Sequence, residues 1–190
     1  FFVNDLFLDA GGTLWAGTDG GILSKQQHQW TTLTVADGLP QDKVTAISQD
    51  RHGHMAFGTD SEGVALYDGV TFTRLTSADG LIDDHIKTLH TDPAGDLWIG
   101  TESGVSRWDG SRFDSFGTSD GLAHGRIADI TTGAKGRRWI ATQGGGLAVF
   151  DDESWSAIDS RDGLAGNHIN AVGIADGGTL WLGTELGLSR

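Results

Sequence analysis

Leu97-Trp98-Ile99-Gly100-Thr101 is the stretch that decides the fold of this chain, because variants of it recur at steps of 41 or 42 residues. The tripeptide Asp-Gly-Leu keeps the same period, beginning at Asp37, Asp79, Asp120 and Asp162. Two different markers in phase indicate a true internal repeat. The other four copies of the first marker are Leu14-Trp15-Ala16-Gly17-Thr18, Met55-Ala56-Phe57-Gly58-Thr59, Arg138-Trp139-Ile140-Ala141-Thr142 and Leu180-Trp181-Leu182-Gly183-Thr184.

Each repeat reads as four short β-strands. In the unit Ile86 to Arg126, short apolar runs are separated by Gly, Asp, Ser or Pro, and they lack the three-and-four spacing of a helix. A period in the low forties with four strands is typical of a β-propeller blade. The sequence therefore predicts an all-β fold, a β-propeller built from four-stranded antiparallel blades.

The chain is expected to form one propeller repeat domain, 1–190, with units 3–43, 44–85, 86–126, 127–168 and an incomplete 169–190. Five inner strands are predicted, but only four outermost ones. Propellers close by pairing strands within one blade, which protects the sheet edges. Three arrangements remain open: a segment of a larger ring, a five-blade ring with one thin blade, or association of chains. We expect a segment or an associating partial ring.

The composition limits the classes of partner that the chain is expected to bind. The formal net charge is −13, which disfavours nucleic acid and anionic membrane surfaces, since both select Lys and Arg. No apolar stretch approaches the length of a membrane span. The chain has no cysteine, so disulfides and thiolate metal sites are excluded. Thirty glycines with only two prolines fit many tight turns.

The combined motif of Asp-Gly-Leu, an Asp-x-x-Gly hairpin, Leu-Trp-Ile-Gly-Thr and an aromatic-Asp-Gly turn resembles the two-component-regulator propeller repeat. Units 86–126 and 169–190 match it most closely, and the resemblance covers essentially the whole chain. It implies the extracytoplasmic sensor region of a bacterial hybrid histidine kinase or related regulator, periplasmic or extracellular, which detects ligands such as glycans. Fold alone does not establish that role.

The repeated tryptophans are interpreted as packing residues. Trp15, Trp98, Trp139 and Trp181 share one position of the second strand, where a flat side chain fills the wedge between neighbouring blades. An aromatic sugar platform is the alternative. The threonine that follows is expected to cap the next turn. Unit 2 lacks the tryptophan, and unit 4 has Arg138 and Ala141 in the motif, so we expect altered packing there without loss of fold.

The Asp-x-x-Gly hairpins, such as those at Asp50 and Asp92, resemble calcium loops only superficially. Each offers one carboxylate, whereas calcium requires six or more oxygen ligands. His52 and His54 flank one such turn without a third ligand nearby in the sequence, so they are interpreted as exposed turn residues. The sequence predicts no metal site and no cofactor.

The strongest candidate site lies in two sets of loops that a propeller gathers around one mouth of its central channel. The residue before each predicted inner strand is basic or can become so, and the loops after the second strands are mostly acidic. Such an alternating ring can hold a hydroxyl-rich or anionic small molecule; chance agreement of solvated loops is the alternative. The candidate ligand-binding residues are Lys43, His85, Arg126, His168, Asp19, Asp60, Glu102, Gln143 and Glu185.

No catalytic residues are predicted, because the known nucleophile, zinc and phosphate-loop motifs are missing from the sequence. Three functional hypotheses follow. The favoured one is a non-catalytic sensor or recognition module binding a small molecule or glycan. The second is a protein-interaction scaffold that self-associates or joins further blades by blade completion. The third is a propeller lyase or glycan-active hydrolase, for which His85, His168 and Glu102 would be the residues to test.

Overall fold

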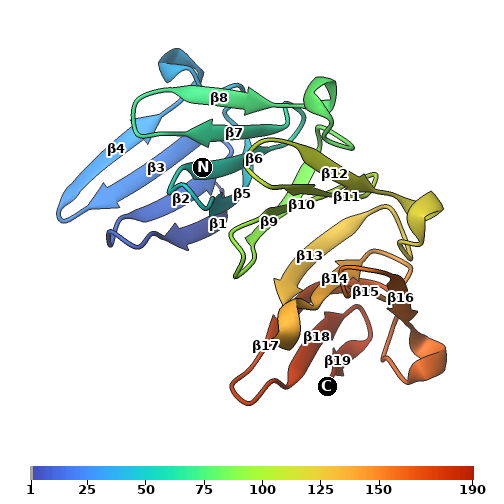
Figure 1. Cartoon of the computed structure of the whole chain (residues 1–190). Coiled ribbons are helices and arrows are strands. Elements are labelled where there is room, and N and C mark those ends of the chain that lie inside the picture. Colours follow the sequence, from blue (N-terminus) through green and yellow to red (C-terminus); the bar gives the residue numbers. More distant parts are fainter. Residues whose placement is uncertain (1) are drawn as a thin grey trace.

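The computed structural model describes residues 2–190, which form five antiparallel sheets one after another along the chain (Figure 1). Four sheets have four strands in sequence order, and the fifth has three. The strands are β1 (Val3–Leu8), β2 (Leu14–Thr18), β3 (Gly21–Gln26), β4 (Gln29–Leu33), β5 (Val44–Gln49), β6 (Met55–Thr59), β7 (Val64–Tyr67), β8 (Phe72–Leu75), β9 (Ile86–Thr91), β10 (Leu97–Thr101), β11 (Val105–Trp108), β12 (Phe113–Phe116), β13 (Ile127–Thr132), β14 (Arg138–Thr142), β15 (Leu147–Phe150), β16 (Trp155–Ile158), β17 (Ile169–Ile174), β18 (Leu180–Thr184) and β19 (Gly187–Ser189).

Each sheet is one propeller blade, so the predicted fold class is confirmed. The innermost strands β1, β5, β9, β13 and β17 begin at the residues predicted from the apolar pattern, and they lie against one another in order. The blades form an open arc and not a closed ring, with β1 near one end and β19 near the other (Figure 1). Within residues 2–190, β19 pairs only with β18.

The loops that carry Asp-Gly-Leu are built around single 3-10 turns, which the sequence analysis did not predict. In the first, the Asp37 carboxylate accepts the Thr34 N–H at 2.9 Å, and Gly38 follows at φ 99°, a conformation that favours glycine. Leu39 then lies buried between blades. The marker is therefore a capped turn followed by a core residue. The turns are η1 (Val35–Asp37), η2 (Ser77–Asp79), η3 (Thr118–Asp120) and η5 (Ser160–Asp162), and η4 (Ala134–Gly136) lies in a hairpin.

The core lies between blades, and the tryptophans fill it as predicted wherever a following blade covers them. Trp98 is fully buried and lies 5.8 Å from the ring of Phe150 in the next blade. Trp15 contacts Phe57 of its next blade at 5.6 Å in the same way, and Trp139 packs with the apolar residues of the fifth blade. The prediction is wrong for Trp181, which is 41% exposed because no described blade packs on it.

The threonine caps of the first motif are confirmed. The Thr101 hydroxyl donates to the Gly104 carbonyl at 2.8 Å and accepts the Ser103 N–H at 3.1 Å, and the side chain is buried. The same bond from threonine to the carbonyl that follows recurs in all five blades, at Thr18, Thr59, Thr101, Thr142 and Thr184. This bond fixes the turn that leads into the third strand.

The second and fourth units, which depart from the repeat motif, still form four-stranded blades, because other side-chain contacts replace those of the motif. In the second blade Ala56 stands at the tryptophan position, and the Asp50 carboxylate accepts from His54 Nδ1 at 3.1 Å in place of an indole. In the fourth blade Arg138 is buried, forms an ion pair with Asp152, and lies over the Trp98 ring at 4.7 Å. The fold therefore tolerates both departures, as the sequence predicted.

Every helix described over residues 2–190 is a turn of three residues, and none is long and apolar enough to cross a membrane. The same part of the chain contains no group of three or more His, Cys, Asp or Glu side chains arranged to hold a metal ion.

Candidate functional site

The candidate site is positioned by the pairing between the first two strands of each blade. The first residue of each inner strand lies opposite the threonine that ends the second strand, as Val44 does with Thr59. The residues just outside this pair therefore meet at the same end of the blade. The Asp60 N–H donates to the Lys43 carbonyl at 3.2 Å, and the Gln143 N–H donates to the Arg126 carbonyl at 2.9 Å. The backbone thus brings the predicted basic and acidic positions together.

In the second blade, these positions form an ion pair. Lys43 Nζ lies 3.0 Å from Asp60 Oδ1, with both side chains about half exposed. The hydrogen bond and charge of Asp60, with a smaller contribution from Asp19, raise the pKa of Lys43. Asp19 is held by the Asn4 amide at 2.9 Å. The first and second blades therefore contribute an acid, a base and an acid in succession.

Glu102 is the centre of the site in the third blade. Its Oε1 atom lies 2.8 Å from Lys87 Nζ and 3.6 Å from Arg126 Nη2, which comes from the loop that leads into the fourth blade. The hydrogen bond from Lys87, together with the charges of Lys87, Arg126 and His85, lowers the pKa of Glu102. Glu102 is therefore ionised at neutral pH, accepts a hydrogen bond from Lys87 of its own blade, and forms an ion pair with Arg126 from the loop that leads into the next blade.

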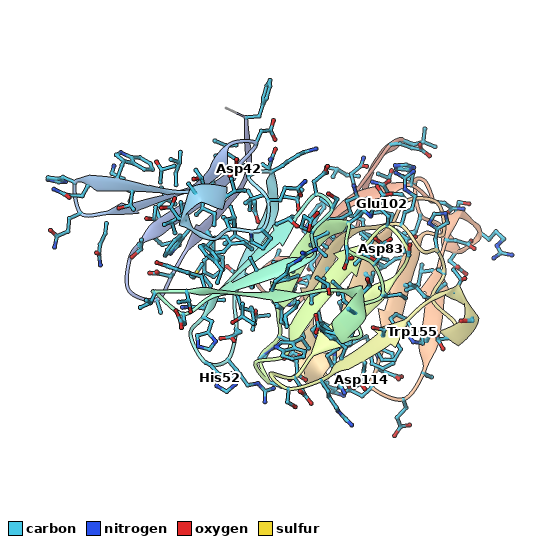
Figure 2. The ribbon with its side chains drawn as sticks, turned by 90° about the horizontal axis from the view of Figure 1, so that it is seen from above. Asp42, His52, Asp83, Glu102, Asp114 and Trp155 are labelled. Atoms are coloured by element: carbon cyan, nitrogen blue, oxygen red, sulfur yellow. The ribbon has the colours of Figure 1, made fainter. Side chains whose placement is uncertain are left out.

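His85 precedes the first residue of β9, in the loop that leads into the third blade. Its Nδ1 atom is 2.8 Å from Asp83 Oδ1, and this hydrogen bond raises the pKa of His85, with further contributions from the charges of Glu102 and Asp60. Asp83 is itself held by the Ser103 hydroxyl and by the His85 N–H. In Figure 2, Asp83 lies between Glu102 above it and Asp114 below it, and His52 and Asp114 lie toward the lower edge.

The structure thus assembles six of the nine predicted residues into one row of alternating charge, which we call the mouth row: Asp19, Lys43, Asp60, His85, Glu102 and Arg126. Gln143, His168 and Glu185 continue it through the backbone alone, since Gln143 pairs with His168 and the Glu185 N–H donates to the His168 carbonyl at 3.1 Å. Over residues 2–190, no ion pair joins these three side chains to the row.

Sequence reasoning missed Lys87 and Asp83. Lys87 is the second residue of β9, and strand alternation could have placed it at the channel. The repeat could have separated Asp83 from its neighbour Asp84, because Asp84 recurs as Asp42 and Asn167, which make the same loop hydrogen bond, whereas Asp83 does not recur. Asp84 Oδ1 accepts the Ser77 N–H at 2.7 Å and braces the loop, whereas Asp83 binds His85.

Below the mouth row, the inner strands line a cavity of about 390 Å³ that contains two half-buried carboxyl groups, Asp5 and Asp129. Each links its blade to the next: Asp5 Oδ2 accepts the Ile47 N–H at 2.7 Å, and Asp129 Oδ2 accepts the Val172 N–H at 2.9 Å. Burial raises the pKa of both carboxyls, although these hydrogen bonds oppose it. Side-chain hydrogen bonds therefore link separate blades along the channel wall.

One family model matches part of this chain, and solved structures share its fold. Residues 80–103 match the family model described as the two component regulator propeller. The extracellular domain of a protein named as a hybrid two component system of B. thetaiotaomicron is similar in structure, with a TM-score of 0.89 over 98% of this chain at 19% identity. The extracellular domain of a one component system of B. thetaiotaomicron gives 0.79 over 99% at 23% identity.

This chain covers 27% of each of those two structures. Virginiamycin B lyase from Staphylococcus aureus shares the fold, with a TM-score of 0.70 over 96% of this chain and 62% of the lyase at 15% identity. No curated protein matches the sequence. The family resemblance predicted from the repeat motifs is confirmed by the matched segment, and the chain carries the two-component-regulator propeller repeat.

Proposed function

We propose that this chain is a non-catalytic recognition module that senses a hydroxyl-rich ligand, such as a glycan, at the mouth row. The observation that carries the proposal is the alternation of acids and bases from four successive blades, with Glu102 shared between Lys87 and Arg126. The similarity to extracellular domains of two-component and one-component systems supports a sensing role outside the cytoplasm.

The chemistry of the mouth row suits sugar hydroxyls. A hydroxyl can accept from a cation and donate to a carboxylate at the same time, so it can insert into an existing ion pair such as Lys43 with Asp60 without leaving either charge unpaired. The half-exposed side chains are accessible, and their pairing holds them in place before the ligand arrives. Such preorganisation lowers the entropic cost of binding.

The proposal is tested with an oligosaccharide array probed with the intact chain and with two variants, H85A and E102Q. H28A is the matched control, since His28 is exposed on the hairpin of the first blade, away from the mouth row. We expect the native chain and H28A to retain the same oligosaccharides and both mouth-row variants to lose them. If no oligosaccharide is retained, or if H85A and E102Q bind like the native chain, the proposal fails.

A second candidate function, assembly through the ends of the arc, rests on a separate observation. Leu6 and Leu8 of the first blade are 59% and 66% exposed, and Leu186 and Leu188 of the last blade are 74% and 73% exposed. Apolar faces of this kind mark interaction surfaces. Light scattering of the native chain and of L188D tests this: assembly predicts an oligomer that L188D reduces to the monomer, and a native monomer would contradict it.

The same His85 variant and H168A also test the lyase or hydrolase hypothesis. That hypothesis requires turnover of a substrate that both variants abolish, whereas recognition requires binding without a product. The similarity to virginiamycin B lyase concerns the fold alone.

A further inference from the structure

The hairpins that join the first two strands offer an internal comparison between blades. In the first and third blades, an aspartate binds the indole of the following tryptophan. Trp15 Nε1 donates to Asp9 Oδ2 at 2.9 Å, and Trp98 Nε1 donates to Asp92 Oδ2 at 3.0 Å. These two blades thus share a carboxylate that accepts from an indole N–H. The pair lies at the end of the inner strand that is farther from the mouth row.

The fourth blade keeps the tryptophan but has Gly133 where the others have aspartate. A Cβ atom built on Gly133 would lie 2.6 Å from Trp139 Nε1, so the indole of this blade occupies space that an aspartate side chain would need. Within residues 2–190, no protein acceptor lies within hydrogen-bond distance of this indole, and Trp139 is only half-buried.

Two basic residues, Lys135 and Arg137, line the same cavity as this indole, in a chain whose net charge is −13. The Arg137 guanidinium lies 5.7 Å from the centre of the Trp139 ring. Lys135 is held in the left-handed region at φ 62°, which is uncommon for a residue other than glycine. Both side chains are exposed. Arg137 also interacts with the charge of Asp151, whose pKa is lowered chiefly by the N–H groups of its own hairpin and partly by Arg137.

These groups open onto a cavity of about 280 Å³ between the fourth and fifth blades. Gly133, Lys135, Arg137 and Trp139 line one part of it, and Ile174 and Leu180 of the fifth blade form an apolar wall. A cavity of this size is close to the lower limit of about 300 Å³ for small-ligand pockets. It combines one neutral donor, two cations and an apolar surface.

We propose that this cavity binds a small organic carboxylate. The carboxylate accepts the Trp139 indole N–H as Asp92 accepts that of Trp98, and it faces Lys135 and Arg137. The apolar body of the ligand packs on Ile174 and Leu180. Because β13 begins at the mouth row and ends at this hairpin, the site lies at the opposite end of the blade and is independent of the proposed sensing function.

The experiment is a titration of the ¹⁵N-labelled chain with benzoate, monitored by the Trp139 indole N–H resonance in two-dimensional NMR, with W139F assigning that resonance. Benzamide has the same shape without the charge and is the ligand control. We expect the resonance to move to saturation with benzoate and to respond far less to benzamide, because charge-assisted hydrogen bonds are about twice as strong as neutral ones.

Two variants test the assignment. G133D should no longer respond to benzoate, because its side chain must displace the Trp139 indole and brings a carboxylate of the chain itself into the cavity. K135A/R137A should weaken binding about tenfold or more while leaving the fold unchanged by circular dichroism. K25A is the matched control, since Lys25 lies over Trp30 at 5.4 Å in the distant first blade, and it should bind like the native chain.

The proposal is overturned if benzoate leaves the Trp139 resonance of the native chain unmoved, or if benzamide moves it equally. It is also overturned if K135A/R137A binds benzoate as well as K25A does. This last comparison remains decisive even if G133D fails to fold, because the double variant changes only exposed side chains.

Discussion

Replacing Gly100 by alanine should destabilise this chain, whereas the same replacement at Gly183 should not, although both glycines hold the same place in the repeated motif. A Cβ atom on Gly100 would lie 2.6 Å from Ile127 Cγ2 and 2.6 Å from Thr88 Cγ2. Ile127 is the first residue of the next inner strand and is 1% exposed, so it cannot easily withdraw. At Gly183 the nearest atom to such a Cβ is Ala171 Cβ, at 4.0 Å.

The magnitudes follow from these contacts. Overpacking a core by one methyl group costs about 1–3 kcal/mol. Where space is free, replacing glycine by alanine stabilises by about 0.4–1 kcal/mol, because the unfolded chain has fewer conformations to lose. The two variants should therefore differ by roughly 1.4–4 kcal/mol in the free energy of unfolding, with opposite signs relative to the native chain.

The assay is equilibrium unfolding in urea of the native chain, G100A and G183A, followed by both circular dichroism and tryptophan fluorescence. Coincident transitions by the two probes are needed before a single free energy is assigned, because repeat arrays can unfold in parts. If G183A loses as much stability as G100A, or if G100A is unchanged, close approach of the next blade is not the reason for this glycine.

Three further predictions follow from buried polar groups. T101V should lower the free energy of unfolding by about 1–3 kcal/mol in urea, because it removes the bond to the Gly104 carbonyl within a buried turn. Burial raises the pKa of Asp129, so its folded form holds a proton more tightly than its unfolded form. The stability that protonated Asp129 contributes is therefore complete below the ordinary carboxyl pKa and falls as pH rises through the pKa of the folded state. Urea unfolding of D129N across this pH range should show a flatter pH profile of stability than the native chain. An unchanged profile would contradict a raised pKa for Asp129. R138L should lower the free energy of unfolding by about 3–5 kcal/mol in the same assay, because it leaves the Asp92 carboxylate, which is 4% exposed and lies 3.9 Å from Arg138 Nε, buried without its cation. Unchanged or higher stability would contradict this, since it would mean that the hydrogen bonds of Asp92 suffice to hold the buried carboxylate.

The parts of the site that the sequence predicted are those that follow from strand pairing. Once the strands are known, the residues flanking the first and second strands of a blade must meet, so Lys43 and Asp60 could be placed together from the repeat alone. The ion pair of Glu102 with Arg126 could not be predicted, because it depends on how far one blade is rotated against the next. No residue pattern within a single repeat records that rotation.

By itself, the sequence determined the five blades, the starts of their inner strands, the threonine caps and the position of the tryptophans, because each depends on alternation or turn chemistry within a few residues. Only the tertiary structure decided which of those positions are buried and which are paired. Trp98 and Trp181 occupy the same place in the motif, yet one is fully buried and the other is 41% exposed. The physical reason is that a blade completes its core on its neighbour, so the environment of a side chain depends on what packs against it.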